Sequence, residues 1–182
     1  MYRKGHIGLG LLSYAPIAYG LTTMGLYAEL LIGIPCVIFF SIAPDFDRWL
    51  PIVSHRGITH TILCGLVASF SVTVLSVYLY DVLSIDAIGL TSVELVAGVI
   101  FFGSLIGVFS HLAGDVLTPS GVAPFAPLSG RTYTLDLVYS NSRRANAFFS
   151  VIGTVAIVAA ISSGVLIHQG VVQLEVSLPP LL

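Results

Sequence analysis

Apolar residues in this chain gather in five long runs, which short polar connections separate. A helix needs about 20 apolar residues to cross the roughly 30 Å hydrocarbon core of a bilayer. We therefore expect an all-α fold, a polytopic membrane helix bundle with about five transmembrane helices in a single integral membrane domain, 1–182. The predicted helices cover about 7–24, 27–43, 61–80, 93–117 and 147–168.

Composition supports a membrane protein. Of the 182 residues, 56% are hydrophobic and 9% are charged, whereas an ordinary soluble domain carries roughly 25% charged residues. The formal net charge of −2 gives no excess of basic residues for binding phosphates, so we expect no nucleic-acid partner. Cys36 and Cys64 lie inside apolar runs without Cys-x-x-Cys spacing, which predicts two small buried hydrophobes rather than a zinc knuckle or a disulfide.

The charges are divided between the two sides of the predicted bundle. If the helices alternate in direction, one side holds every Lys and Arg: Arg3, Lys4, Arg48, Arg56, Arg131, Arg143 and Arg144. The other side holds the acidic residues Glu29, Asp81, Asp86, Glu94 and Glu175. By the positive-inside rule, we expect a multi-pass protein of the cell membrane with a cytoplasmic N-terminus. The basic start of the first apolar run is also typical of a signal peptide, but we expect this run to be retained as a helix.

Histidine and aspartate residues gather where the predicted helices start or end. They are His6 at the start of the first helix, Asp45 and Asp47 after the second, His55 and His60 before the third, and His111 and Asp115 near the end of the fourth. Start, end, start and end is the order that places all of them on one face of an up-and-down bundle. Ionisable groups at membrane depth are costly and usually functional.

Metal binding is the chemistry that this set predicts. His111 and Asp115 are four positions apart, so they share a helix face and can point at one ion. Imidazole with carboxylate suits zinc, our first expectation, and also manganese or iron, with magnesium a further alternative. We predict these metal ligands: His6, Asp45, His55, His60, His111 and Asp115. With Asp47 the set exceeds one tetrahedral site, and it fits two metals, or one metal with carboxylates orienting the imidazoles.

Each residue also has an ordinary alternative role. His6 is typical of an interfacial polar residue, and Asp45 of a helix or turn cap. Asp47 can pair with Arg48, and His55 is typical of an ordinary loop histidine. A lone histidine near a membrane boundary, such as His60, is often just solvated.

The order of the motifs resembles a known family. An N-terminal His, then Pro44-Asp45-Phe46-Asp47, then His55-Arg56-Gly57-Ile58-Thr59-His60, then His111-x-x-x-Asp115 before a Pro-rich loop resembles the predicted membrane-bound, metal-dependent hydrolases of the YdjM family. That family is similar in motif order to the zinc-dependent phospholipase C and S1/P1 nuclease group.

The resemblance covers roughly residues 6–135 and implies a divalent-metal hydrolase of phosphoesters. It implies ligand positions at His6, Asp45, His60, His111 and Asp115, with Asp47 and His55 as further candidates. The chain lacks the later His-x-x-x-Glu helix of the soluble phospholipases, which favours one or two metals over three.

These observations lead to metal-assisted hydrolysis at the cytoplasmic membrane surface as the first hypothesis. A lipid or lipid-linked phosphoester is the expected substrate, because such a molecule need not leave the bilayer. We predict that Asp47 is catalytic and orients the water as a base. Asp45 is the alternative residue for this role. Arg56 would hold a phosphate bidentately, with Arg48 and Arg131 as second choices, and the 118–146 loop would cover the site.

Two other interpretations stay open, and a third is dismissed. A transmembrane His-x-x-x-Asp pattern also occurs in metal or proton transporters, although transport sites tend to lie near the midplane rather than at helix ends. A closed structural metal site is the second interpretation. Pro119-Ser120-Gly121 and Ser142-Arg143 echo a lipid phosphatase signature, but in the wrong order. Small residues in 147–168 allow close helix packing but specify no oligomeric state.

Overall fold

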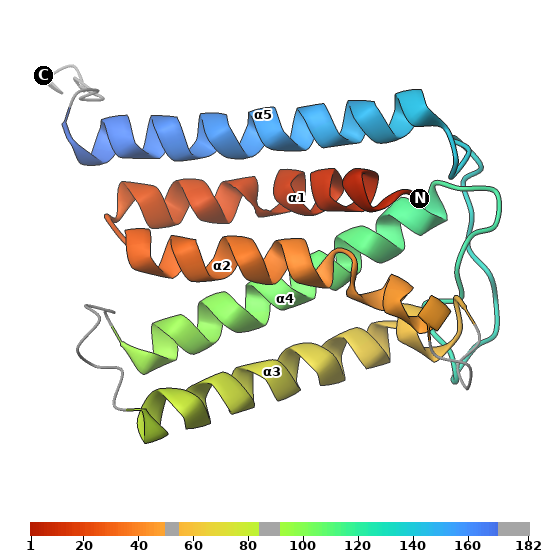
Figure 1. Cartoon of the computed structure of the whole chain (residues 1–182), viewed down its shortest axis with the longest axis horizontal. Helices are drawn as coiled ribbons and strands as arrows, with labels where there is room; N and C mark the ends of the chain where they lie inside the picture. Colours follow the sequence, from red (N-terminus) through yellow and green to blue (C-terminus); the bar gives the residue numbers. More distant parts are fainter. Residues whose placement is uncertain (50–54, 84–91, 171–182) are drawn as a thin grey trace, which may run out of the picture.

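The structure is a computed structural model that describes residues 1–49, 55–83 and 92–170. Its elements are α1 (Arg3–Thr23), α2 (Tyr27–Phe40), the 3₁₀ helices η1 (Ala43–Trp49) and η2 (Ile58–His60), α3 (Ile62–Val82), α4 (Val93–Val116) and α5 (Arg143–His168). The five α-helices lie side by side, and the N-terminus lies at the same end of the bundle as the 117–142 loop (Figure 1). The predicted all-α fold is confirmed.

Two helices begin before the expected positions. α1 begins at Arg3 and α5 at Arg143, four residues earlier than predicted in each case. The apolar pattern misses these first turns because their residues are polar. Ser142 shows why α5 begins where it does, since its hydroxyl accepts a hydrogen bond from the Ala145 amide at 3.3 Å as an N-cap.

Three helices, α3, α4 and α5, are long and apolar enough to cross a membrane. The α2–η1 pair, which bends by 40°, makes a fourth span if it is counted as one. α2 alone has 14 residues and is about 21 Å long, which is less than a bilayer core. The polytopic bundle is confirmed, and the described residues contain three or four spans by length and composition where we expected about five.

α1 differs from the other long helices because it lies inside the bundle. It packs between α5 on one side and α2 and α4 on the other (Figure 1). A Cβ on Gly8 would collide with the backbone of Phe149, and one on Gly153 would collide with the backbone of Gly8. The α1 and α5 backbones therefore touch directly, which glycine at these positions permits.

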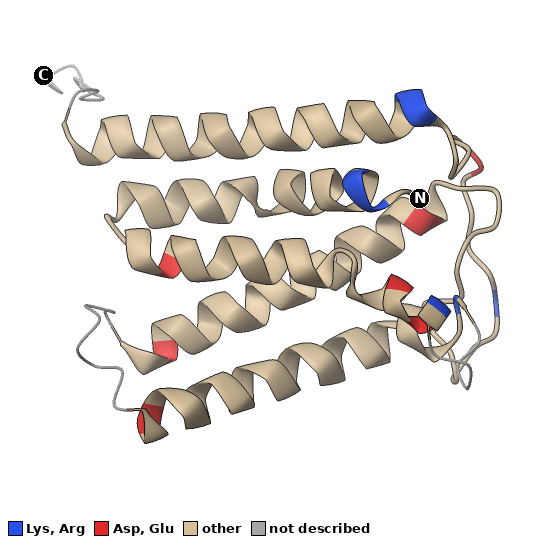
Figure 2. Cartoon of the chain, viewed as in Figure 1, with Lys and Arg blue, Asp and Glu red and all other residues tan. Residues whose placement is uncertain are grey.

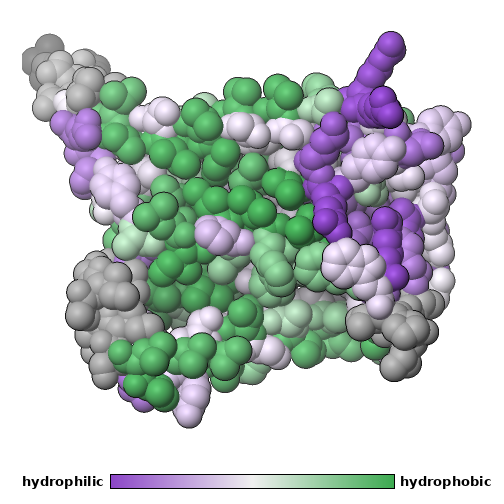
Figure 3. Space-filling view, in the orientation of Figure 1, coloured by the Kyte–Doolittle hydropathy of each residue, from purple (hydrophilic) through white to green (hydrophobic). Residues whose placement is uncertain are grey.

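Lys and Arg are segregated along the bundle as expected. They lie at the end that holds the N-terminus, η1 and the 117–142 loop, where Asp45, Asp47 and Asp115 also lie (Figure 2). At the opposite end, the described residues include Glu29 at the start of α2, Asp81 at the end of α3 and Glu94 at the start of α4, and no Lys or Arg. Asp86 and Glu175 lie outside the described residues. Apolar side chains cover the middle of the visible face, and hydrophilic ones gather at the N-terminal end (Figure 3).

Candidate metal centre

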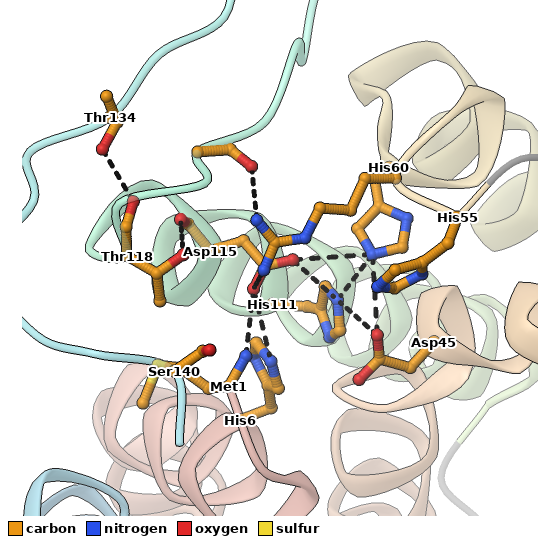
Figure 4. Close-up of polar contacts among 12 residues, drawn as sticks. Met1, His6, Asp45, His55, His60, His111, Asp115, Thr118, Thr134 and Ser140 are labelled. Atoms are coloured by element: carbon orange, nitrogen blue, oxygen red, sulfur yellow. Dashed lines mark hydrogen bonds and ion pairs between the residues drawn. The ribbon is translucent and has the colours of Figure 1, made fainter. Parts of the chain in front are cut away.

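Four potential ligand atoms converge at the N-terminal end of the bundle. They are Nε2 of His60 at the end of η2, Nε2 of His111 in α4, Oδ1 of Asp45 in η1 and Oδ2 of Asp115 in α4 (Figure 4). We call these four atoms the ligand cluster. The side chains that carry them are at most 8% exposed.

The spacing within the ligand cluster suits a cation. The two Nε2 atoms lie 3.1 Å apart. His60 Nε2 is 3.8 Å from Asp45 and 3.5 Å from Asp115, and His111 Nε2 is 4.0 and 3.6 Å from the same carboxylates. Atoms bound at about 2.0–2.1 Å to a tetrahedral zinc lie about 3.3 Å from one another. Small adjustments would therefore bring either carboxylate into one coordination sphere with the two imidazoles.

Unpartnered buried atoms give a second indication of a cation. Both ring nitrogens of His6 are buried without a hydrogen-bond partner among the described residues, and so is Oδ2 of Asp115. The His6 ring stacks on His111, with centroids 3.9 Å apart, and its Nε2 lies 3.7 Å from Asp115 Oδ1. Buried polar atoms nearly always have a partner, and a metal ion would supply one. The residues present therefore fit a metal.

His111 is fixed in one orientation by the end of α2. Its Nδ1 lies 2.8 Å from the Ser41 carbonyl oxygen. Because a carbonyl only accepts, Nδ1 carries the proton and Nε2 turns its lone pair toward the ligand cluster. His111 belongs to two potential ligand sets, one with His6 and Asp115 and one with Asp45 and His60. Because Nδ1 is bonded to Ser41, Nε2 is the nitrogen that His111 can offer to an ion in either set.

His60 is oriented by its own neighbours. Its Nδ1 lies 3.3 Å from Asp47 Oδ2 and 3.0 Å from the Thr59 hydroxyl. A carboxylate behind the distal nitrogen is the usual outer-shell partner of a metal-binding histidine. Asp47 thus faces His60 from behind, away from the ligand cluster.

His55 also hydrogen-bonds to the carboxylate of Asp47. Arg48 donates to His55 Nε2 at 3.0 and 3.2 Å, and because a guanidinium only donates, the His55 proton lies on Nδ1 and goes to Asp47 Oδ1 at 2.8 Å. Asp47, His55 and His60 form a third potential ligand set. His55 lies outside the ligand cluster and is 35% exposed, so its predicted role as a ligand stays a prediction.

Arg56 connects the η2 segment to Asp115 and to the loop after α4. Its guanidinium donates to Asp115 Oδ1 at 3.2 Å and to the Gly121 carbonyl at 2.8 Å. The terminal ammonium of Met1 lies 3.2 Å from the same Asp115 oxygen. The two oxygens of Asp115 therefore have different neighbours: Oδ1 faces the cationic groups of Arg56 and Met1, and Oδ2 faces the imidazoles of His60 and His111. Arg56 has a φ of 63°, a left-handed conformation that non-glycine residues rarely adopt and that concentrates at functional sites.

The other two arginines considered for phosphate make different contacts. Arg48 lies 3.3 Å from Asp45 Oδ1, an atom of the ligand cluster, in addition to its bonds with His55. Arg131 lies over the ring of Tyr133, 5.3 Å from its centroid. Arg56 is thus the arginine with a direct hydrogen bond to Asp115.

Comparison with known proteins places the chain in a family. A family model described as YdjM inner membrane protein matches residues 1–175. The chain belongs to the YdjM inner membrane protein family. No curated protein and no solved structure matches the chain. The YdjM assignment that the motif order predicted is confirmed over nearly the whole chain, and its description agrees with the apolar helices found here.

Two residues that support the YdjM site were not singled out by the sequence. The first is Thr59, whose hydroxyl donates to Asp47 at 2.7 Å. The second is Asn146, which is fully buried in the first turn of α5. Its side chain accepts from the Tyr2 amide at 2.8 Å and donates to the carbonyls of Ser140 and Ser142, so it ties the start of α1 to α5. The sequence signal that could have identified Asn146 is a side-chain amide at the start of a long apolar run.

Proposed function

We propose that this member of the YdjM family is a divalent-metal-dependent hydrolase of a phosphoester in a lipid or lipid-linked substrate. The observation that carries the proposal is the ligand cluster, with the unpartnered nitrogens of His6 beside it. Mixed nitrogen and oxygen donors favour zinc, with manganese or magnesium as alternatives. Such an ion, when bound, lowers the pKa of water toward about 7.

The proposed ligands are His60, His111, Asp45 and Asp115, with His6 as a further one. Because the two ligand sets that contain His111 share its Nε2, the arrangement favours one metal over two. A catalytic zinc typically has three protein ligands and a water. These five groups are therefore more than one ion needs, and one of them, Asp45, can act on the water instead.

The side chains around the ligand cluster have complementary roles in this proposal. Asp47 holds His60 in the orientation that aims its Nε2, while Asp45 takes the proton of the attacking water. Arg56 binds a phosphoryl oxygen with the N–H groups that Asp115 and Gly121 leave available. The water oxygen bonds to phosphorus, the P–O bond to the lipid breaks, and the lipid alcohol leaves with a proton.

The surroundings support a membrane-bound substrate and a cytoplasmic site. The ligand cluster lies at the end of an apolar bundle, where a lipid phosphate would sit at the bilayer surface. The same end carries the basic residues, so the positive-inside rule favours the cytoplasmic face of the cell membrane for both the site and the N-terminus.

Elemental analysis and phosphoester assays of the purified protein test the proposal. The wild-type protein should hold a divalent metal and hydrolyse lipid phosphoesters, and the His111→Ala, Asp115→Ala double variant should do neither. Wild-type metal content in the double variant would refute the assigned ligands. Metal-dependent ion flux in liposomes without hydrolysis would instead favour a transporter.

A further inference from the structure

An apolar cavity of about 110 Å³ lies beside the ligand cluster, between the end of α2 and the start of α3. Phe40 and Pro44 line one side, Cys64 and Ala68 line the other, and Val108 of α4 is also part of the wall. An apolar cavity of comparable size, about 150 Å³, stays dry and binds small hydrocarbons. The walls therefore suit a hydrocarbon rather than water.

The cavity exists because α3 stands apart from α2. α3 packs along α4 and lies at the edge of the bundle (Figure 1). The residues that would otherwise close the space are small: Ala43 in η1, and Gly65 and Ala68 in α3. A space between two apolar elements at the edge of a membrane bundle is accessible from the side, through the bilayer.

Thr59 connects this cavity to the metal centre. It lines the cavity, and its hydroxyl lies 2.7 Å from Asp47 Oδ2 and 3.0 Å from His60 Nδ1. Pro44 and Thr59, which both line the cavity, directly precede Asp45 and His60, two residues of the ligand cluster. A molecule with its chain in the cavity would have its polar end next to the metal centre.

A second apolar cavity, about 220 Å³, lies on the other side of the start of α3. It lies between Ile62, Leu63 and Leu66 and the 124–128 segment. None of the residues that line it belongs to the ligand cluster or hydrogen-bonds to it within the described part of the chain. Of these two cavities, the first has the connection that a substrate needs.

We propose that the cavity next to Thr59 takes the alkyl chain of the phosphoester substrate, in the stretch nearest its phosphate. The chain enters sideways from the bilayer, between η1 and α3, and places the phosphate against the ligand cluster. This proposal rests on the proposed function for its substrate, but binding of the chain is measured without any turnover.

Photo-crosslinking in nanodiscs of phosphatidylcholine tests the proposal. The probe is a phosphatidic acid with a diazirine near the carboxyl end of one acyl chain, and mass spectrometry locates the adducts. We expect adducts on Cys64, Ala68 and Val108, and competition by unlabelled phosphatidic acid but not by extra phosphatidylcholine. Adducts on Leu66 and the 124–128 segment instead, or equal competition by both lipids, would overturn the proposal.

A matched pair of variants sharpens the test. Ala68→Phe fills the cavity, whereas Val67→Phe adds the same ring at a neighbouring position that is 58% exposed on the outer face of α3. Ala68→Phe should lower the cavity adducts and the turnover of long-chain phosphoesters by about tenfold or more, with wild-type metal content, and Val67→Phe should change neither. Undiminished adducts in Ala68→Phe contradict the proposal, and the wild-type adduct map decides by itself if Ala68→Phe does not fold. Correct adducts without hydrolysis would refute the enzymatic function and leave the chain-binding cavity in place.

Discussion

The Nε2 atoms of His60 and His111 lie 3.1 Å apart, although the residues are 51 positions apart in the chain. His111 has its proton on Nδ1, where Ser41 accepts it. A neutral His60 must choose between donating to His111 through Nε2 and donating to Asp47 through Nδ1. A cation between the two rings removes this conflict, because His60 then donates to Asp47 while both Nε2 atoms bind the ion.

Replacing His111 with alanine should remove the metal. Elemental analysis after purification should show at least a tenfold lower metal content, given that loss of even an outer-shell partner typically weakens binding about 10- to 100-fold. His168→Ala is the matched control, because His168 lies at the end of α5, where it contacts the Thr23 carbonyl. Equal metal loss in both variants would contradict the assignment.

The sequence predicted which side chains lie close together, but not which of them face the ligand cluster and which orient its histidines. The order of helix starts and ends placed His6, His60 and His111 at one face, and the structure brings them together. The apolar pattern does not show that the chain leaves α2 as a 3₁₀ helix. In that helix Asp45 points into the ligand cluster, whereas Asp47, two positions on, points at the back of His60. The left-handed conformation of Arg56 was equally hidden, because it depends on contacts with Asp47, Asp115 and Gly121.

Asp47→Ala should weaken metal binding without abolishing it. The carboxylate orients His60 and holds the Thr59 hydroxyl and the Arg56 amide. Loss of such an outer-shell partner typically costs about 10- to 100-fold in metal affinity. Competition with a chelator of known affinity measures the change, and Asp136→Ala in the exposed loop serves as the control. Complete metal loss would instead make Asp47 a direct ligand.

Arg56→Lys should lower activity although it keeps the charge. The guanidinium reaches Asp115 and Gly121 at the same time through two nitrogens, and a lysine ammonium does not reproduce that fork. We expect kcat/KM for a lipid phosphoester to fall about tenfold or more, as for the loss of about 1.4 kcal/mol of transition-state stabilisation. Arg131→Lys, which changes an arginine next to Tyr133, is the control. Equal activity of Arg56→Lys and the wild type would exclude a role for the fork.

Gly8→Ala should destabilise the bundle. Its new methyl group would collide with the backbone of Phe149 and push α1 away from α5. Overpacking of this kind costs about 1–3 kcal/mol, so the unfolding temperature in detergent should fall. Gly20→Ala is the matched control in the same helix, because its Cβ would meet no atom within 4 Å. A larger loss for Gly20→Ala than for Gly8→Ala would contradict the direct contact between the α1 and α5 backbones.

Metal binding should also stabilise the fold, since the ligand cluster joins η1, η2 and α4. A ligand that binds only the folded state stabilises it by about 2.7 kcal/mol when present at 100 times its dissociation constant. Zinc at that excess should therefore raise the unfolding temperature of the chelator-treated wild-type protein, measured by thermal unfolding in detergent. The same zinc concentration should give a much smaller rise in His111→Ala, because this variant loses the ligand atom that both sets around His111 share. An equal rise in both proteins would mean that the stabilising ion binds elsewhere, and the ligand cluster would then lack its proposed occupant.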